Sequence, residues 1–119
     1  MDSSVIIKNV SKSFGNLKAI DDISLTINSG EMFAIMGADG SGRTTLFRLM
    51  SGLLYPDKGK ISVAGCDTVS AHKGLRCQIG YMPGRFSLYG DLTVEENLNF
   101  FASLHGVSPE ENRYLVDDI

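Results

Sequence analysis

The sequence predicts an α/β protein in which a parallel sheet core follows an N-terminal antiparallel β layer. Three observations support this fold class. Apolar and polar residues alternate in the first thirty residues, Met32–Met36 is continuously apolar, and a glycine-rich loop leads from that run into a helical pattern. With 119 residues, of which 43% are hydrophobic, the chain has the size of one globular domain.

The antiparallel layer comes first along the chain. Ile23, Leu25 and Ile27 alternate with polar residues, and Val5–Ile7 is a similar run rich in β-branched residues. Residues typical of tight turns lie between these runs, at 14–16, and after the second run, at 28–30. We therefore expect two half-buried strands that form an antiparallel layer.

The core strand and its helix come next. Met32–Met36 is apolar at every position and ends abruptly in glycines, which is typical of a strand buried on both faces. The apolar residues of Thr44–Ser51 recur at helical spacing, and Gly52 stands where a helix C-terminus often needs a left-handed residue. A helix is therefore expected to follow the glycine loop directly.

Two more strands and three helical segments are expected in the rest of the chain. The strands are Lys60–Ala64 and Gln78–Met82, with a helical turn over Ala71–Leu75 between them. Thr93 and Glu96 form a capping-box pattern ahead of a helix. The apolar face of that helix contains Val94, Leu98 and Phe101, and a last helix is expected to begin at Ser108–Pro109.

Charge and composition exclude several classes of function. A formal net charge of -3 without a basic patch argues against a nucleic-acid partner. The longest mainly apolar run is far shorter than the roughly 20 residues of a membrane-spanning helix, and the N-terminus lacks a secretory signal. Cys66 and Cys77 are expected to be free thiols in a reducing cytosol, and the lone His72 and His105 are not expected to bind a metal.

The loop Gly37–Thr44 matches the P-loop spacing at every defined position except the lysine. Its glycines allow consecutive N–H groups to point inward as an anion nest, and the following helix adds its positive end. Such a nest suits a triphosphate, and the Thr44 hydroxyl suits Mg²⁺. The sequence therefore predicts a P-loop NTPase-like core with these nucleotide-binding residues: Gly37, Ala38, Asp39, Gly40, Ser41, Gly42, Arg43, Thr44 and Thr45.

Two other interpretations of this loop are weaker. Isolated glycines often make only a tight strand-to-helix turn, but here the spacing, the preceding strand and the following helix agree. A dinucleotide fingerprint needs the order G-x-G-x-x-G, whereas this loop has G-x-x-G-x-G.

Arg43 is the main departure from the P-loop pattern. A lysine ammonium is a compact point charge beneath the phosphates, whereas a guanidinium is a wide planar fork with a different reach. Arginine keeps the charge and can donate two hydrogen bonds to a phosphate, but alignment in the transition state should suffer. We therefore expect weakened nucleotide binding and strongly impaired hydrolysis.

With these motifs the chain resembles the ATP-binding cassette (ABC) family, specifically the N-terminal half of the nucleotide-binding subunit of exporter-type transporters. Val10–Gly15 is similar to the family's A-loop, in which an aromatic ring stacks on adenine, and Phe14 occupies that place. The alternative for Phe14 is a packing role in its strand. Ile79–Pro83 and Asp91–Leu98 resemble the strand before the family's Q-loop and the helix after it, but Gly84 replaces the Q-loop glutamine.

The resemblance implies ATP and Mg²⁺ as ligands and two kinds of protein partner. These are the transmembrane domains of an exporter and a second nucleotide-binding domain that forms a dimer. Arg85, Phe86 and Tyr89 are candidates for the transmembrane contact, whereas Leu88 is expected in the domain's own core. The protein would then lie in the cytoplasm, on the inner face of the cell membrane through its partner.

The family's second half carries the signature sequence, the Walker B acidic residues and the switch histidine, none of which this chain contains. No catalytic residue is therefore assigned. The resemblance implies that residues 1–119 form the N-terminal part of one nucleotide-binding domain, incomplete at the C-terminus. Met32–Met36 would then lack a neighbouring strand, and we expect the free domain to be marginally stable.

Three functions remain in competition. The first is an ATP-binding fragment of an ABC transporter that drives export. The second is a catalytically inactive nucleotide-binding or regulatory remnant, which Arg43 and Gly84 favour because both lie where this half of the family's fold meets the γ-phosphate or water. The third, a P-loop kinase or GTPase, is disfavoured by the antiparallel layer before the loop.

Overall fold

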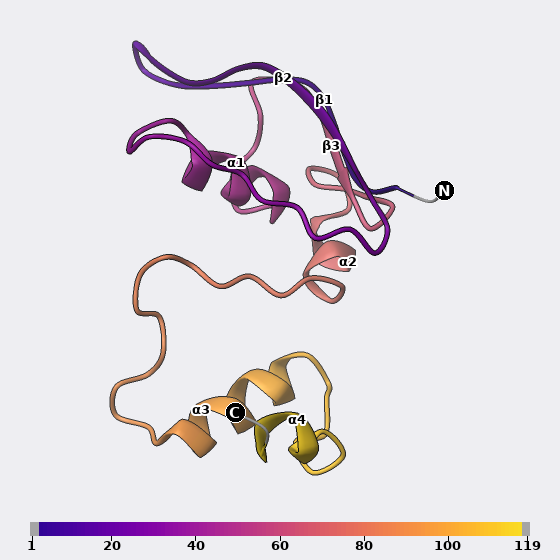
Figure 1. Ribbon diagram of the computed structural model, residues 1–119, viewed down its shortest axis with the longest axis vertical. Helices are drawn as coiled ribbons and strands as arrows, with labels where there is room; N and C mark the ends of the chain where they lie inside the picture. Colours follow the sequence, from indigo (N-terminus) through magenta and orange to yellow (C-terminus); the bar gives the residue numbers. More distant parts are fainter. Residues whose placement is uncertain (1–2, 118–119) are drawn as a thin grey trace. The chain divides into compact units, whose positions relative to one another are not determined.

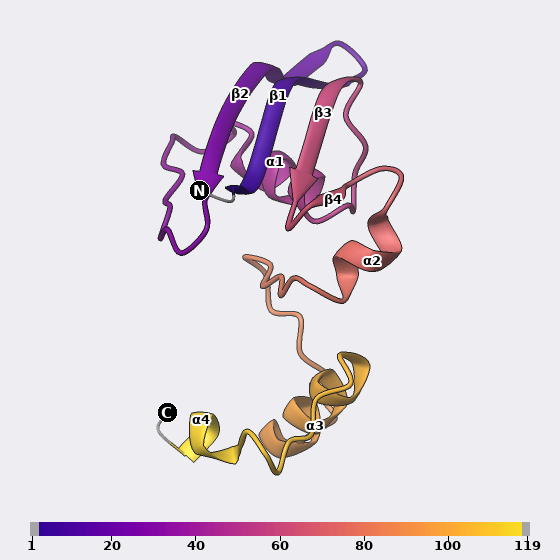
Figure 2. The same ribbon diagram turned by 90° about the vertical axis from the view of Figure 1, so that its right-hand side faces the viewer.

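The computed structural model describes residues 3–117. The chain divides into two compact units, Met1–Tyr81 and Met82–Ile119. The strands all belong to the first unit. Figure 1 labels β1, β2 and β3 and the helices of both units, and Figure 2 also labels β4. Among the described residues no helix is both long and apolar enough to cross a membrane.

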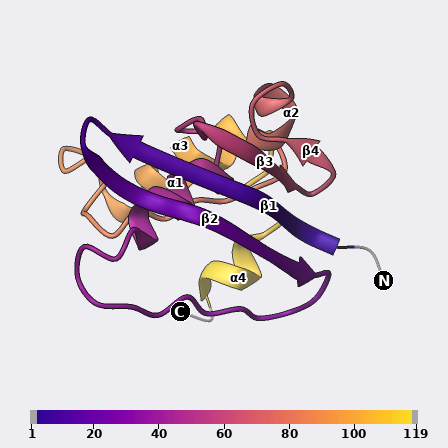
Figure 3. The same ribbon diagram turned by 90° about the horizontal axis from the view of Figure 1, so that it is seen from above.

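The first unit is built on a four-stranded sheet in the order β2-β1-β3-β4. Each neighbouring pair is antiparallel, and Figure 3 shows β1 and β2 running side by side in opposite directions. Gly15, with a φ of 58°, makes the turn between β1 and β2, as its sequence predicts. The antiparallel layer is therefore confirmed, and its strands are β1 (Ser3–Phe14), β2 (Leu17–Asn28), β3 (Lys58–Val63) and β4 (Cys66–Asp67).

Asp57 fastens the segment before β3 to β1. Its carboxylate accepts a hydrogen bond from the Ser13 N–H at 2.7 Å and forms an ion pair with Lys12 at 3.0 Å. The backbone N–H of Asp57 also donates to the Ser11 carbonyl at 2.9 Å. The Ser13 N–H, and then Lys12, lower the pKa of Asp57, because both stabilise its charged form.

Helix α1 (Arg43–Met50) covers one face of this sheet, as Figure 2 shows. Leu46 and Leu49 point toward the sheet, and Leu49 is fully buried. The predicted helix after the glycine loop is therefore confirmed, and Gly52 follows it with a φ of 70°. The buried apolar residues of the unit are Ile7, Val10, Ile20, Leu46, Leu49, Ile61, Val63 and Leu75.

The predicted helical turn near Ala71 is also present, as helix α2 (His72–Arg76). The sequence did not indicate β4, which has two residues and follows β3 across a tight turn. Ala64 and Gly65 form this turn with φ values of 50° and 76°. Two consecutive left-handed residues match the twist of a β-hairpin, which explains the short fourth strand.

Two strand predictions are wrong. Met32–Met36 and Gln78–Met82 have no strand structure, and Met32 and Met36 are almost fully exposed. A strand forms only where a neighbouring strand accepts and donates its backbone hydrogen bonds. Within residues 3–117 no strand pairs with either segment, so their apolar composition alone does not produce a sheet.

The second unit contains helices α3 (Val94–Leu104) and α4 (Arg113–Asp117). The predicted capping box is present, since the Glu96 carboxylate accepts from the Thr93 N–H at 2.7 Å and Thr93 Oγ1 accepts from the Glu96 N–H at 3.2 Å. The last helix begins five residues later than Ser108, because residues 109–112 form turns instead.

A buried asparagine holds the loop before α3. Asn97 Oδ1 accepts from the Tyr89 N–H at 2.9 Å, and Nδ2 donates to the carbonyls of Tyr89, Leu92 and Thr93 at 3.0–3.3 Å. The side chain is 5% exposed, whereas the apolar residues of the expected helix face remain partly exposed. The order of this loop therefore depends on hydrogen bonds more than on apolar burial.

Asn97→Ala is expected to lower the free energy of unfolding by about 1–2 kcal/mol, because the part-buried Tyr89 N–H loses its acceptor and the Leu92 carbonyl loses a donor. Denaturant unfolding of the protein measures this change. Asn99→Ala is the matched control, because Asn99 is exposed on the same helix and is expected to change stability by less than about 0.5 kcal/mol. Equal losses of unfolding free energy in the two variants would contradict the role of Asn97 in holding the loop before α3.

Candidate functional site

The glycine loop joins α1 through a left-handed residue. Gly42 is the N-cap of α1 with a φ of 93°, and its carbonyl accepts the first helical hydrogen bond, from the Leu46 N–H at 2.9 Å. No side chain of the described residues caps this helix. The N–H groups at the start of α1 therefore remain available to an anion, which the positive end of the helix also favours.

Two glycines of the loop lie where an added Cβ would meet neighbouring atoms. A Cβ on Gly42 would overlap the carbonyl oxygen of Ala19 in β2, and a Cβ on Gly37 would press on the Ser41 side chain. The loop is therefore curled on itself at one end and seated against the sheet at the other. The Ser41 N–H strengthens this curl by donating to the Ala38 carbonyl at 3.1 Å.

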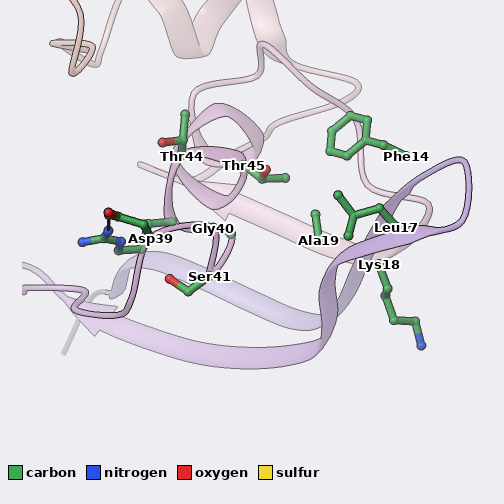
Figure 4. Close-up of a pocket in the computed structure, with 11 residues that line it drawn as sticks. Phe14, Leu17, Lys18, Ala19, Asp39, Gly40, Ser41, Thr44 and Thr45 are labelled. Carbon is green, nitrogen blue, oxygen red and sulfur yellow. Dashed lines mark hydrogen bonds and ion pairs between the residues drawn. The ribbon is translucent and has the colours of Figure 1, made fainter.

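A pocket of about 370 Å³ lies between this loop and the β1–β2 turn. Figure 4 shows Phe14 on one side and the residues of the loop on the other. Gly37 and Ala38 are outside the lining, so the structure brings together all but two of the predicted nucleotide-binding residues. The lining residues are Phe14, Leu17, Lys18, Ala19, Asp39, Gly40, Ser41, Gly42, Arg43, Thr44 and Thr45.

Phe14 is half-exposed, with 46% of the residue's surface accessible. Lys12 Nζ lies 5.5 Å from the centre of the Phe14 ring, which gives a cation–π contact. A ring that is held by a neighbour and still open at the pocket can offer a face to a planar heterocycle. This exposure supports a stacking role over a purely internal packing role.

Thr44 offers an exposed hydroxyl in the first turn of α1. Hydroxyl oxygen is a hard ligand of the kind that Mg²⁺ prefers, and magnesium bound with a nucleotide takes further oxygens from phosphate and water. Thr44 therefore fits a magnesium ion that arrives with phosphate. Among the described residues no group of three or more acidic, histidine or cysteine side chains forms a separate metal site.

Arg43 does not point freely into the pocket. Its Nη2 lies 3.3 Å from Asp39 Oδ1, and this ion pair spans the glycines of the loop. The guanidinium is the loop's own cation, because residues 37–44 contain no lysine and no second arginine. The positive charge that a nucleotide would need is thus already paired with a carboxylate.

Sequence reasoning missed three residues of the pocket: Leu17, Lys18 and Ala19. They enter through the hairpin, because Phe14 pairs with Leu17 and Ser13 pairs with Lys18. The two-residue turn after Phe14 is the signal that could have found them. A turn of this length fixes the strand register, and therefore which residues of the second strand lie opposite Phe14 and its neighbours. Lys18 adds a second cation beside the loop and is paired with Asp21 at 2.8 Å.

Residues of the second unit that were predicted to contact a membrane partner are exposed. Phe86 is 82% and Tyr89 is 52% exposed, and Arg85 is also exposed. The expectation that Leu88 is buried in the core is wrong, since 47% of its surface is accessible. The hydrogen bonds of Asn97 and the ring contacts of Tyr89 hold this loop, and Leu88 stays exposed.

Tyr89 also belongs to an aromatic cluster. The Tyr89 ring meets Phe100 edge-on with ring centres 5.2 Å apart, and it stacks with Phe101 at 6.3 Å. A Cβ on Gly84 would have no heavy atom within 4 Å, so a side chain at that position is not excluded by lack of space. Gly84 itself has no side chain that could donate or accept a hydrogen bond.

The sequence pattern of the ABC transporter family matches residues 20–118. The chain is 41% identical over 100 residues to the probable multidrug ABC transporter ATP-binding protein YbhF of Escherichia coli (strain K12), covering 84% of this chain and 17% of that protein. It is 38% identical over 104 residues to the ABC transporter ATP-binding protein NatA of Bacillus subtilis (strain 168), covering 87% of this chain and 42% of NatA. The chain thus spans less than half the length of these relatives.

Solved structures agree with this similarity. The structure of an ATP-binding subunit of an ABC transporter superposes with a TM-score of 0.81 at 30% identity, covering 92% of this chain and 46% of that chain. The ATP-binding cassette MJ0796, a dimer in a post-hydrolysis state bound to ADP and Pi, superposes with a TM-score of 0.77 at 29% identity, covering 92% of this chain and 53% of the other. The predicted fold class is confirmed by these neighbours.

Proposed function

Because this chain belongs to the ABC transporter family and corresponds to part of its ATP-binding subunit, we propose that it binds Mg-ATP to drive the export of a substrate. The observation that carries the proposal is the pocket between the half-exposed Phe14 and the curled P-loop. The ring face at one side suits the base of a nucleoside triphosphate, and the anion nest at the other side suits its phosphates.

Each part of the nucleotide has a proposed binder. Phe14 stacks on the adenine, the N–H groups of the loop and of α1 hold the phosphates, and Arg43 supplies the charge. Thr44 would hold Mg²⁺, which lowers the negative charge on the phosphates and fixes their geometry. The proposal includes all predicted nucleotide-binding residues, although Gly37 and Ala38 act through the shape of the loop rather than at the pocket surface.

Two protein partners belong to the same proposal. Arg85, Phe86 and Tyr89 would contact the transmembrane domains, and a second nucleotide-binding domain would complete a dimer. This is supported by the exposure of these three residues and by the dimeric state of the similar cassette MJ0796. We place the protein in the cytoplasm at the inner face of the membrane, with residues 1–119 as the N-terminal part of one nucleotide-binding domain.

A second candidate function is a nucleotide-binding module without catalysis. Two observations favour it: Arg43 stands in place of the P-loop lysine, and Gly84 has no side chain to orient Mg²⁺ or water. ATP turnover by the whole protein with its membrane partner separates the two candidates. Turnover supports the transporter, whereas ATP binding without turnover supports the module.

Arg43→Lys is expected to tighten Mg-ATP binding about three- to tenfold, because a compact ammonium fits beneath the phosphates and cannot form the same planar pairing with Asp39. Isothermal titration of the protein with Mg-ATP measures the change. Arg43→Ala is the matched control and is expected to weaken binding about tenfold or more, since charge-assisted phosphate contacts are lost. ATP affinity that is the same in all three forms would contradict the proposed site.

A further inference from the structure

The P-loop contains one acidic and one basic side chain, and the two are paired. Arg43 Nη2 lies 3.3 Å from Asp39 Oδ1, four residues earlier in the chain. The Asp39 side chain is fully exposed and has no other hydrogen-bond partner among the described residues. Arg43 is therefore the contact that orients this carboxylate, and Asp39 is the contact that orients the guanidinium.

The same guanidinium donors serve carboxylates and phosphates. An arginine fork donates to either group in similar geometry, so a carboxylate within reach competes directly with an incoming phosphate. Asp39 lies at the end of the pocket opposite Phe14 and Lys18, as Figure 4 shows. The pairing therefore draws the loop's cation toward the end of the pocket that is away from the aromatic ring.

We propose that Asp39 is a positioning residue that holds Arg43 in the nucleotide-free protein and competes with the nucleotide phosphates for its guanidinium. Asp39 thereby lowers the affinity for Mg-ATP through Arg43. This inference rests on the proposed function, because it requires that phosphate enters the loop. It goes beyond that function by assigning the affinity to a pair of side chains within the loop itself.

The ion pair between Asp39 and Arg43 is weak enough for a bound phosphate to replace it. Exposed ion pairs contribute little, because water solvates both charges and the side chains lose freedom when they pair. Breaking this pair on binding therefore reduces the affinity only a few-fold. Asp39 therefore weakens Mg-ATP binding but does not prevent it.

Titration with Mg-ATP of the protein and of Asp39→Asn tests the proposal. The asparagine keeps the shape and removes the charge, so the Kd is expected to fall about two- to fivefold, in line with the typical strength of exposed pairs. Asp39→Glu keeps a carboxylate and is expected to remain within about twofold of the wild-type Kd. An unchanged or higher Kd for Asp39→Asn would overturn the proposal.

Asp117→Asn is the matched control variant. Asp117 pairs with Arg113 at the same spacing of four residues, at 4.0 Å and with both side chains exposed. Neither residue lines the pocket. Removing this carboxylate changes the net charge equally, and the Kd for Mg-ATP is expected to stay the same. A Kd that falls equally in Asp39→Asn and Asp117→Asn would show an effect of net charge and would overturn the proposal.

A double-mutant comparison tests the role of Arg43 in this effect. In an Arg43→Ala background, Asp39→Asn is expected to change the Kd by less than about 1.5-fold, because the residue on which Asp39 acts is gone. An undiminished effect in that background would mean direct repulsion between Asp39 and phosphate and would overturn the positioning role. Failure of every form to bind Mg-ATP would instead overturn the proposed function, and the inference with it.

Discussion

Gly42→Ala is expected to lower the free energy of unfolding by about 2–4 kcal/mol and to weaken Mg-ATP binding about tenfold or more. Gly42 has a φ of 93°, where an alanine side chain is strained, and its Cβ would also overlap the Ala19 carbonyl oxygen. The loop would have to leave the sheet to relieve the overlap. The anion nest and the start of α1 would move with it.

Gly40→Ala separates the strain of the left-handed backbone from the overlap with the Ala19 carbonyl. Gly40 has a φ of 79°, but a Cβ there would have no heavy atom within 4 Å. Its replacement is therefore expected to cost only the strain of the left-handed backbone, about 1–2 kcal/mol. Thermal unfolding followed by circular dichroism compares the two variants. A loss for Gly40→Ala as large as that for Gly42→Ala would show that contact with Ala19 is unimportant.

Gly59→Ala is expected to lower the free energy of unfolding by about 3 kcal/mol or more, the largest effect on stability outside the pocket. Gly59 lies in β3 with a φ of 82°, and its Cβ would overlap the carbonyl oxygens of Lys8 and Asn9 in β1. The pairing of β1 with β3 depends on that close approach. Denaturant unfolding of the purified protein measures the loss.

Gly65→Ala provides the comparison, because Gly65 has a φ of 76° in the turn after β3 and open space around it. We expect a cost of about 1–2 kcal/mol for this variant, from the backbone alone. The difference between the two glycines isolates the strand contact. If Gly59→Ala proves no worse than Gly65→Ala, then β1 and β3 tolerate a wider separation than the structure indicates.

The parts of the fold that sequence analysis predicted correctly depend on local signals. The alternation in Ile23–Ile27, the turn at Gly15 and the capping box at Thr93 each act within a few residues, and each is confirmed. The turn from the glycine loop into α1 belongs to the same class, since the spacing of its glycines predicts it. Features that depend on residues close together in the chain can therefore be predicted from a single sequence.

The predictions that failed depend on partners distant in sequence. Met32–Met36 has the composition of a buried strand, but a strand needs a neighbour, and composition does not show whether one is present. Leu88 was expected in a core that the second unit does not build around it. Lys18 was missed because strand register, and not its own residue type, brings it to the pocket.

The order of the strands determines when α1 gains its contacts with the sheet during synthesis. β1 pairs with its successor β2, but it also pairs with β3, so Val5 lies opposite Val63. The P-loop and α1 lie in the long connection that this second pairing closes, and α1 packs against β3. Local hairpins form quickly, whereas pairing across a long connection waits for its distant strand. On the ribosome, the growing chain therefore acquires its β1–β2 hairpin first, and α1 gains its contacts with β3 only after Lys58–Val63 has emerged.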